Sequence, residues 1–316
     1  MRSNSRSYRK GSKPRHPDAY FPVIDIKEAD LSIKGQDFNL AVIGADLLHK
    51  AGFLGEGVKI GVVDSGCVQG VIQKSFVKGE KEGDINGHGT HVVSIIQSIA
   101  PKAEIFMAKA MNKSGGGRRE DLINGTEWLL DQGVKKVNGS FAFNASTEVK
   151  EYIELIDQGV QAGVIFCFAA GNEGSDKVSF PSNRHNVFSV GAINKALSVT
   201  DFSNQGTEID LVAPGKDILG DSPKGRKVTM SGTSQACPHV TGMLALYVEY
   251  MRTQGVEPDF FKAYSDITKG STLDLGREGF DTAYGYGLIK PYFAGLRDEP
   301  QKVAGFFDKL FKWLFL

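Results

Sequence analysis

Short, almost continuously apolar segments that alternate with amphipathic ones constrain the fold of this chain more than any other feature. A strand buried on both faces is apolar along its length, and parallel strands need a covering segment between them. The order predicts an α/β fold in three layers, with a mostly parallel central sheet and helices on both faces. Strands are expected at residues 58–63, 105–111, 134–138, 164–168, 187–192 and 209–212, and helices at 39–50, after 88, at 119–132, at 147–162 and after 234.

Polar residues at the ends of these strands are the first candidates for a site, because ligands of such sheets bind beyond the carboxyl ends of the strands. Asp64 directly follows the strand at 58–63, where turn amides can keep a partly buried carboxylate ionised. Asn172 follows the strand at 164–168, and its side-chain amide can donate to a developing oxyanion. Taken singly, Asp64 is equally well explained as a turn residue, and for Asn172 a turn residue is the better explanation.

Two helix starts carry the other candidates. His88 begins a helix with a buried apolar face, and His91 lies three residues later. A metal pair would need carboxylate ligands at a suitable spacing, which the sequence lacks, so a base at His88 and a structural His91 are favoured. Ser234 follows a Gly-Thr turn and precedes the apolar run 243–248. At such a helix start a serine is either a cap or a nucleophile beside groups that stabilise an anion.

The blocks around these four residues resemble, in the same order, the signature blocks of the subtilisin-like serine proteases (subtilases, peptidase family S8). The blocks are Asp64–Gly66, His88–Val92, Ala170–Gly174 and Gly232–Val240, and the resemblance extends over about residues 40–292. It implies a serine endopeptidase that cleaves proteins or peptides through an acyl-enzyme. Ser234 would be the nucleophile, His88 the general base and Asp64 its orienting partner, with the oxyanion hole formed by Asn172 and the Ser234 N–H.

The same resemblance implies where substrate binds. The segment 138–142 matches the family strand whose backbone pairs with an extended substrate. Ala142 and Phe143 stand where the family usually has two glycines, so weaker cleavage after large aromatic residues is expected. The expected substrate-binding residues are Ser140, Phe141, Ala142, Ala169, Ala170 and Gly171.

The chain also departs from the family pattern. Between His91 and Ala100 there is no room for the loop that binds calcium tightly, so neither a metal nor a cofactor is expected, although weaker calcium sites elsewhere stay open. The polar segment 67–86 reads as a short surface loop. We expect neither a signal peptide nor a folded pro-domain before residue 40. This expectation resembles the intracellular branch of the family and predicts a cytoplasmic protein. An N-terminal extension can cover the active site in that branch, and Tyr20–Ile24 either does so here or packs on the domain surface.

Composition excludes several classes of function. A formal net charge of zero gives no broad attraction to nucleic acid, and no apolar stretch is long enough to span a bilayer. The three cysteines, Cys67, Cys167 and Cys237, are far apart in apolar contexts, which predicts buried thiols in a reducing compartment. The segment 220–227 lacks the core of a phosphate-binding loop. The alternative to an enzyme is a catalytically silent subtilase fold that acts as a peptide-binding or scaffold protein, against which the complete set of catalytic residue types argues.

Three parts are expected along the chain. Residues 1–24 form a basic, disordered extension, 25–295 the peptidase domain and 296–316 a C-terminal tail. In the tail, residues 303–316 place polar side chains on one helical face and aromatic and leucine side chains on the other. We expect this strip to dock on its own domain or a second subunit, with a membrane surface as the alternative.

Overall fold

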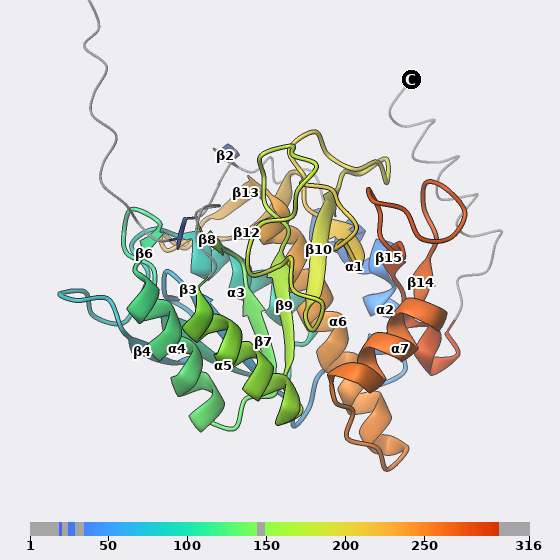
Figure 1. The fold of residues 1–316 in the computed structure, drawn as a ribbon, viewed down its shortest axis with the longest axis horizontal. Helices are drawn as coiled ribbons and strands as arrows, with labels where there is room; N and C mark the ends of the chain where they lie inside the picture. Colours follow the sequence, from blue (N-terminus) through green and yellow to red (C-terminus); the bar gives the residue numbers. More distant parts are fainter. Residues whose placement is uncertain (1–18, 21–24, 29–34, 144–148, 297–316) are drawn as a thin grey trace, which may run out of the picture.

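A nine-stranded sheet runs through the centre of the molecule (Figure 1). The computed structural model describes residues 19–20, 25–28, 35–143 and 149–296. All neighbouring strands of this sheet are parallel except the pair β14 and β15 at one edge. In spatial order the strands are β14 (Thr272–Leu273), β15 (Leu288–Ile289), β11 (Leu211–Pro214), β10 (Phe188–Ile193), β9 (Ile165–Ala169), β7 (Lys136–Gly139), β3 (Lys59–Asp64), β5 (Glu104–Lys109) and β4 (Ile72–Ser75).

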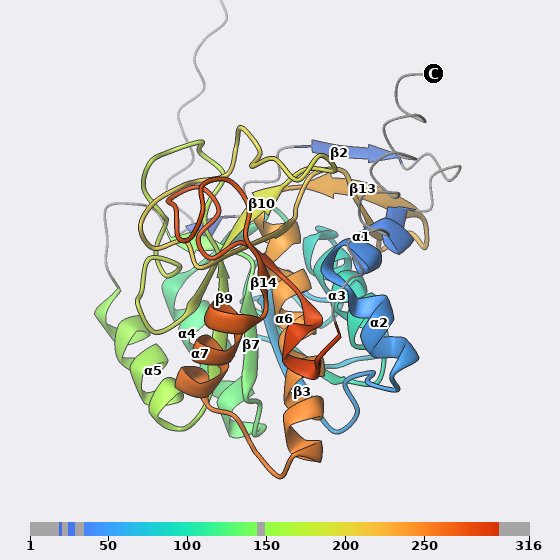
Figure 2. The same ribbon diagram turned by 90° about the vertical axis from the view of Figure 1, so that its right-hand side faces the viewer.

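Helices cover both faces of the sheet, which Figure 2 shows from the side. One face carries α3 (His88–Ile99) and α6 (Thr233–Thr253), with α1 (Gly35–Ile43) and α2 (Ala45–Lys50) outside them. The other face carries α4 (Arg119–Asp131), α5 (Lys150–Gln161) and α7 (Phe260–Gly270), and the 3₁₀ helix η1 (Pro291–Ala294) follows β15. The predicted three-layer α/β fold is therefore confirmed.

Helix α6 is the central helix of the core. Every residue from Thr233 to Val248 is buried, which explains why this segment is apolar on all sides instead of along one stripe. It packs closely against α3, because a Cβ atom on Gly242 would lie only 2.8 Å from Ile99. The two helices begin at the carboxyl ends of the strands, and this packing brings their first turns together.

Two small antiparallel sheets flank these helix starts and include the N-terminal segment. One consists of β6 (Gly116–Gly117), β1 (Ala19–Tyr20) and β8 (Ala142–Phe143). The other consists of β12 (Ile218–Asp221), β13 (Lys227–Ser231) and β2 (Asp25–Glu28). Parts of the segment 1–24, which we expected to be disordered, are thus paired. Residues 1–18 and 21–24 lie outside the described residues, as does the C-terminal strip 303–316.

Two predictions of local structure were wrong. The helix expected at 39–50 is two helices, because Gly44 adopts a left-handed conformation with φ of 76° and packs against the ring of Pro291. The polar segment 67–86, expected to be a loop, contains the edge strand β4 beside β5. Its side chains alternate between exposed and half-buried, so it lacks the apolar run that marks the central strands. No helix among the described residues is long and apolar enough to cross a membrane.

Candidate active site

Asp64 and His88 form a buried pair at the carboxyl end of β3. The Nδ1 atom of His88, the first residue of α3, lies 2.9 Å from Oδ1 and 3.0 Å from Oδ2 of Asp64. Burial raises the pKa of Asp64, while the imidazole and the Ser65 N–H, which donates to Oδ1 at 2.7 Å, act in the opposite direction. The close approach between the start of α3 and the turn after β3 requires glycine at position 89, since a Cβ atom there would lie 2.2 Å from the Gly66 carbonyl oxygen.

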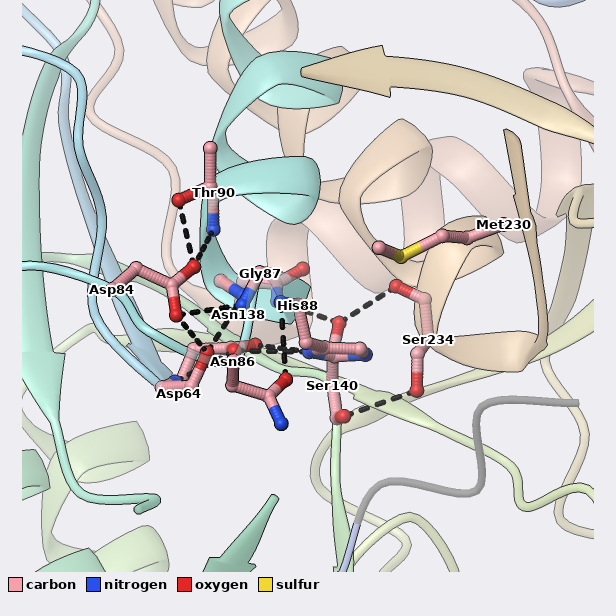
Figure 3. A network of polar contacts seen from close by, with 12 residues as sticks. Asp64, Asp84, Asn86, Gly87, His88, Thr90, Asn138, Ser140, Met230 and Ser234 are labelled. Carbon is pink, nitrogen blue, oxygen red and sulfur yellow. Dashed lines mark hydrogen bonds and ion pairs between the residues drawn. The ribbon is translucent and has the colours of Figure 1, made fainter. Parts of the chain in front are cut away.

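Ser234 lies in the first turn of α6, on the other side of the His88 ring (Figure 3). Its side chain is buried, and its hydroxyl donates to the Ser140 carbonyl oxygen at 3.1 Å. The ring in Figure 3 lies between the Asp64 carboxylate and Ser234. The structure thus brings together the three residues that the sequence placed on separate strands and helices.

The backbone of Ser234 is held by a neutral chain of hydrogen bonds. Pro238 has no N–H, so the Ser234 carbonyl lacks the donor that a helix normally supplies four residues later. The Ser140 hydroxyl donates to this carbonyl instead, at 2.9 Å. Asn138 donates to the Ser140 hydroxyl at 2.9 Å and accepts from the Thr241 hydroxyl at 3.0 Å. These side chains join β7 to the first turn of α6, which carries Ser234.

Asn172 lies three residues beyond the end of β9, with its side-chain amide oriented by Thr233. The Oδ1 atom accepts from the Thr233 N–H at 2.7 Å and from the Thr233 hydroxyl at 3.0 Å. The amide nitrogen therefore points away from Thr233. A Cβ atom on Gly232 would lie 3.4 Å from Asn172 Nδ2 and 3.6 Å from the Ser234 nitrogen, so both nitrogens border the space in front of Gly232.

The predicted substrate-binding residues lie on two segments beside this space. Ser140, Phe141 and Ala142 run from the end of β7 into β8, and Ala169–Gly171 connect β9 to Asn172. Phe141 and Phe143 are buried, and the Phe143 ring packs against Tyr152 and Phe180. Glu173, the residue that follows Asn172 in the chain, lines a cleft of about 960 Å³. Its lining residues include Phe143, Glu173, Ser179 and Asn204.

The structure adds residues that sequence reasoning missed. Asp84 is buried beside the start of α3 and accepts four hydrogen bonds, although it lies in the segment read as a surface loop. Its position four residues before His88 was the available signal, because a carboxylate near a helix start can satisfy free N–H groups. Asn138 is the second residue whose hydrogen bonds to the site were not predicted from the sequence.

The connection between α3 and β5, where the sequence predicts no calcium-binding loop, is short. Residues 100–103 connect α3 to β5, and this connection, Ala-Pro-Lys-Ala, contains no carboxylate or amide side chain. Within the described ranges, no group of three or more histidine, cysteine, aspartate or glutamate side chains is placed to hold a metal. All three cysteines are buried free thiols, as expected.

Comparison with known proteins identifies the family. The subtilase family model matches residues 55–287. An intracellular serine protease of Paenibacillus polymyxa is 33% identical over 285 residues, which cover 79% of this chain and 85% of that protein. The major intracellular serine protease of Bacillus subtilis (strain 168) is 34% identical over 256 residues, which cover 72% and 77% of the two chains. The chain therefore belongs to the subtilase family and is a serine endopeptidase that acts on proteins or peptides.

Its fold is similar to a solved structure as well. The crystal structure of a lanthipeptide protease matches with a TM-score of 0.76 and 25% sequence identity, covering 84% of this chain and 96% of that one. The alternative of a silent scaffold gains no support from these relatives.

Proposed function

We propose that this endopeptidase cleaves peptide bonds with Ser234 as nucleophile, His88 as general base and acid, and Asp64 as the group that orients and stabilises the imidazolium. The observation that carries the proposal is the bidentate Asp64–His88 contact on the side of the ring opposite Ser234 (Figure 3). Because Nδ1 donates to the carboxylate, the other ring nitrogen is left in the neutral ring as the acceptor for the Ser234 proton.

The reaction proceeds in two stages. The Ser234 O–H turns from the Ser140 carbonyl towards His88, which takes the proton as Oγ bonds to the substrate carbonyl carbon. The negative charge on the substrate oxygen is stabilised by Asn172 Nδ2 and the Ser234 N–H. His88 then protonates the leaving amine, which departs from the acyl-enzyme. In the second stage His88 takes a proton from water as the water oxygen bonds to the ester carbon; the bond from that carbon to Oγ then breaks, His88 returns the proton to Oγ, and the carboxylic acid product leaves.

The test of this mechanism is casein hydrolysis by the wild type and Ser234→Ala. We expect the variant to lose activity by a factor on the order of 10⁴ or more. Mass spectrometry of the N-terminus of each sample measures self-processing, which should occur only in the wild type. Equal casein hydrolysis by the two proteins would overturn the mechanism.

We propose further that the enzyme works in the cytoplasm. Support comes from its similarity to two proteins named intracellular serine proteases and from its buried free thiols, which suit a reducing compartment. Fractionation of producing cells, with an antibody against the protein, should find it in the cytoplasmic fraction. Recovery mainly from the culture medium would contradict this location.

The N-terminal segment is proposed to block substrate binding. Strand β1 pairs with both β6 and β8, and β2 pairs with β13, the strand that leads to Gly232. The backbone of residues 19–20 thus uses the edge of β8 that an added substrate strand would need. Deletion of residues 1–24 should raise kcat/KM on a short peptide several-fold, whereas deletion of residues 1–18, which spares β1, should not. Equal rates for both truncations would sink the idea.

Cleavage after large aromatic residues is proposed to be weak. Phe143 replaces a usual glycine and lines the cleft next to Asn172, where it reduces the space for a substrate side chain. Profiling with a peptide library measures this preference directly. The proposal fails if phenylalanine and tyrosine are the best residues before the cleaved bond.

A further inference from the structure

Asp84 lies beside the first turn of α3 and accepts four hydrogen bonds. Its Oδ1 atom accepts from the Ser65 hydroxyl at 3.0 Å and from the Gly87 N–H at 2.8 Å. Its Oδ2 atom accepts from the N–H and the hydroxyl of Thr90, at 2.9 and 2.7 Å. The residue is only 7% exposed, so few of these bonds can be replaced by water.

The four donors belong to the two elements that carry Asp64 and His88. Ser65 directly follows Asp64, while Gly87 and Thr90 lie on either side of His88 in the chain (Figure 3). The Ser65 hydroxyl also accepts from the Gly89 N–H at 3.0 Å, which adds a second link between the strand end and the helix. Asp84 therefore ties the turn after β3 to the start of α3, and the distance between the carboxylate and the imidazole depends on this tie.

The charge of Asp84 acts at the same place. It contributes to raising the pKa of Asp64, after the larger effect of burial, and it also contributes to raising that of Cys67. A buried negative charge at this position favours positive charge on the ring of His88. Two other titratable groups interact with the charge of the ring, Asp64 on β3 and His91 on α3. Farther out, Cys67 after β3 interacts with Asp84 and Asp64, and Asp221 on β12 interacts with His91.

We propose that Asp84 is a positioning residue that holds Asp64 and His88 in register and stabilises the imidazolium formed during catalysis. The inference rests on the proposed roles of Ser234, His88 and Asp64. Asp84 itself contacts neither substrate nor the reacting atoms, so its effect passes through His88.

The test compares Asp84→Asn, Ser65→Ala and the exposed control Asp131→Asn in the full-length chain. The amide of Asp84→Asn has one acceptor oxygen and no charge, so we expect kcat to fall by about tenfold to a hundredfold. The acid limb of the kcat/KM profile should move to lower pH, because the variant lacks a negative charge that stabilises the imidazolium. Ser65→Ala keeps the charge and removes the tie, so its kcat should fall with the acid limb unmoved. Asp131→Asn should match the wild type.

The outcomes separate this inference from the proposed function. Thermal unfolding curves give the fraction of each variant that is folded at the assay temperature. Each rate is divided by that fraction. If Asp84→Asn has the same kcat and the same acid limb as the control Asp131→Asn, the positioning role is overturned. This holds even if Ser234→Ala and His88→Ala abolish activity and so support the proposed function. If Asp84→Asn does not fold, the test rests on Ser65→Ala. A kcat equal to that of the wild type in Ser65→Ala would then overturn the positioning role. Activity that survives in Ser234→Ala would overturn the proposed function itself.

Discussion

The acid–base half of the site and the nucleophile half are held by groups of different charge. Around His88 the tie is a buried carboxylate, Asp84, with four donors. Around Ser234 it is the neutral chain of Ser140, Asn138 and Thr241. In the proposed reaction, positive charge develops on the imidazole and negative charge develops beside Ser234. A carboxylate therefore stabilises the reaction in the first half, and in the second it would oppose the oxyanion.

The comparison makes a general prediction. Replacement of a group in the acid–base half should change both the rate and its pH dependence. Replacement in the nucleophile half should change the rate alone. The following variants test this distinction, from the largest expected effect to the smallest.

Asn172→Leu removes the proposed side-chain donor to the oxyanion, together with the acceptor of the Thr233 N–H and hydroxyl, while keeping a similar shape. We expect kcat to fall by about 10² to 10³, since one such donor contributes about 2.7–4 kcal/mol to the transition state. KM and the acid limb of the pH profile should stay near wild type, because neither substrate ground-state binding nor the imidazolium uses this amide. Steady-state kinetics on a peptide substrate from pH 5 to 9 measures both, and a kcat within threefold of wild type would exclude Asn172 from the oxyanion hole.

Asn138→Leu breaks the neutral chain behind Ser234. The Ser140 hydroxyl loses its donor, and the Thr241 hydroxyl keeps only the longer bond to the Cys237 carbonyl at 3.3 Å, at a cost to stability of about 1–3 kcal/mol. We expect kcat to fall about tenfold through a looser nucleophile turn, with the acid limb unmoved. Thr241→Val, which removes only the outer link, should have a smaller effect. A shift of the acid limb in Asn138→Leu as large as that in Asp84→Asn would erase the difference between the two halves.

Helices α3 and α6, which carry His88 and Ser234, each also contain a buried neutral histidine. His91 on α3 donates to the Ile218 carbonyl at 3.0 Å, and His239 on α6 donates to the Gln235 carbonyl at 2.8 Å. Burial lowers the pKa of His91 to about 3 and that of His239 to about 4. The unfolded chain takes up these protons near pH 6.5, so the stability contribution is complete above that pH and is lost as the pH falls towards the folded values.

His239→Gln should remove one of these two contributions. Between pH 6.5 and 5 the free energy of unfolding of the wild type should fall by about 2 kcal/mol more than that of the variant. Urea unfolding at the two pH values measures the difference. The same pH dependence in both proteins would mean that His239 is not kept neutral by burial.

The sequence predicted the middle strands of the central sheet and the candidate site residues because both leave local signals. Apolar runs mark β3 and β9, which Asp64 ends and Asn172 follows, and His88 and Ser234 lie at helix starts. Asp84 escaped notice because a polar loop does not reveal which of its carboxylates is buried. The break at Gly44 depends on Pro291, which is far away in the sequence. The pairing of β1 and β2 depends likewise on strands from three distant parts of the chain.

Labelling with a fluorophosphonate, followed by peptide mass spectrometry, tests the central claim most directly. The reagent reacts with a serine only when a neighbouring base takes its proton. The wild type should carry the label on Ser234 alone, His88→Ala should react far more slowly, and Ser234→Ala should remain unlabelled. A label on another serine, or equal labelling rates in the wild type and His88→Ala, would contradict the assignment of Ser234 and His88 as nucleophile and base.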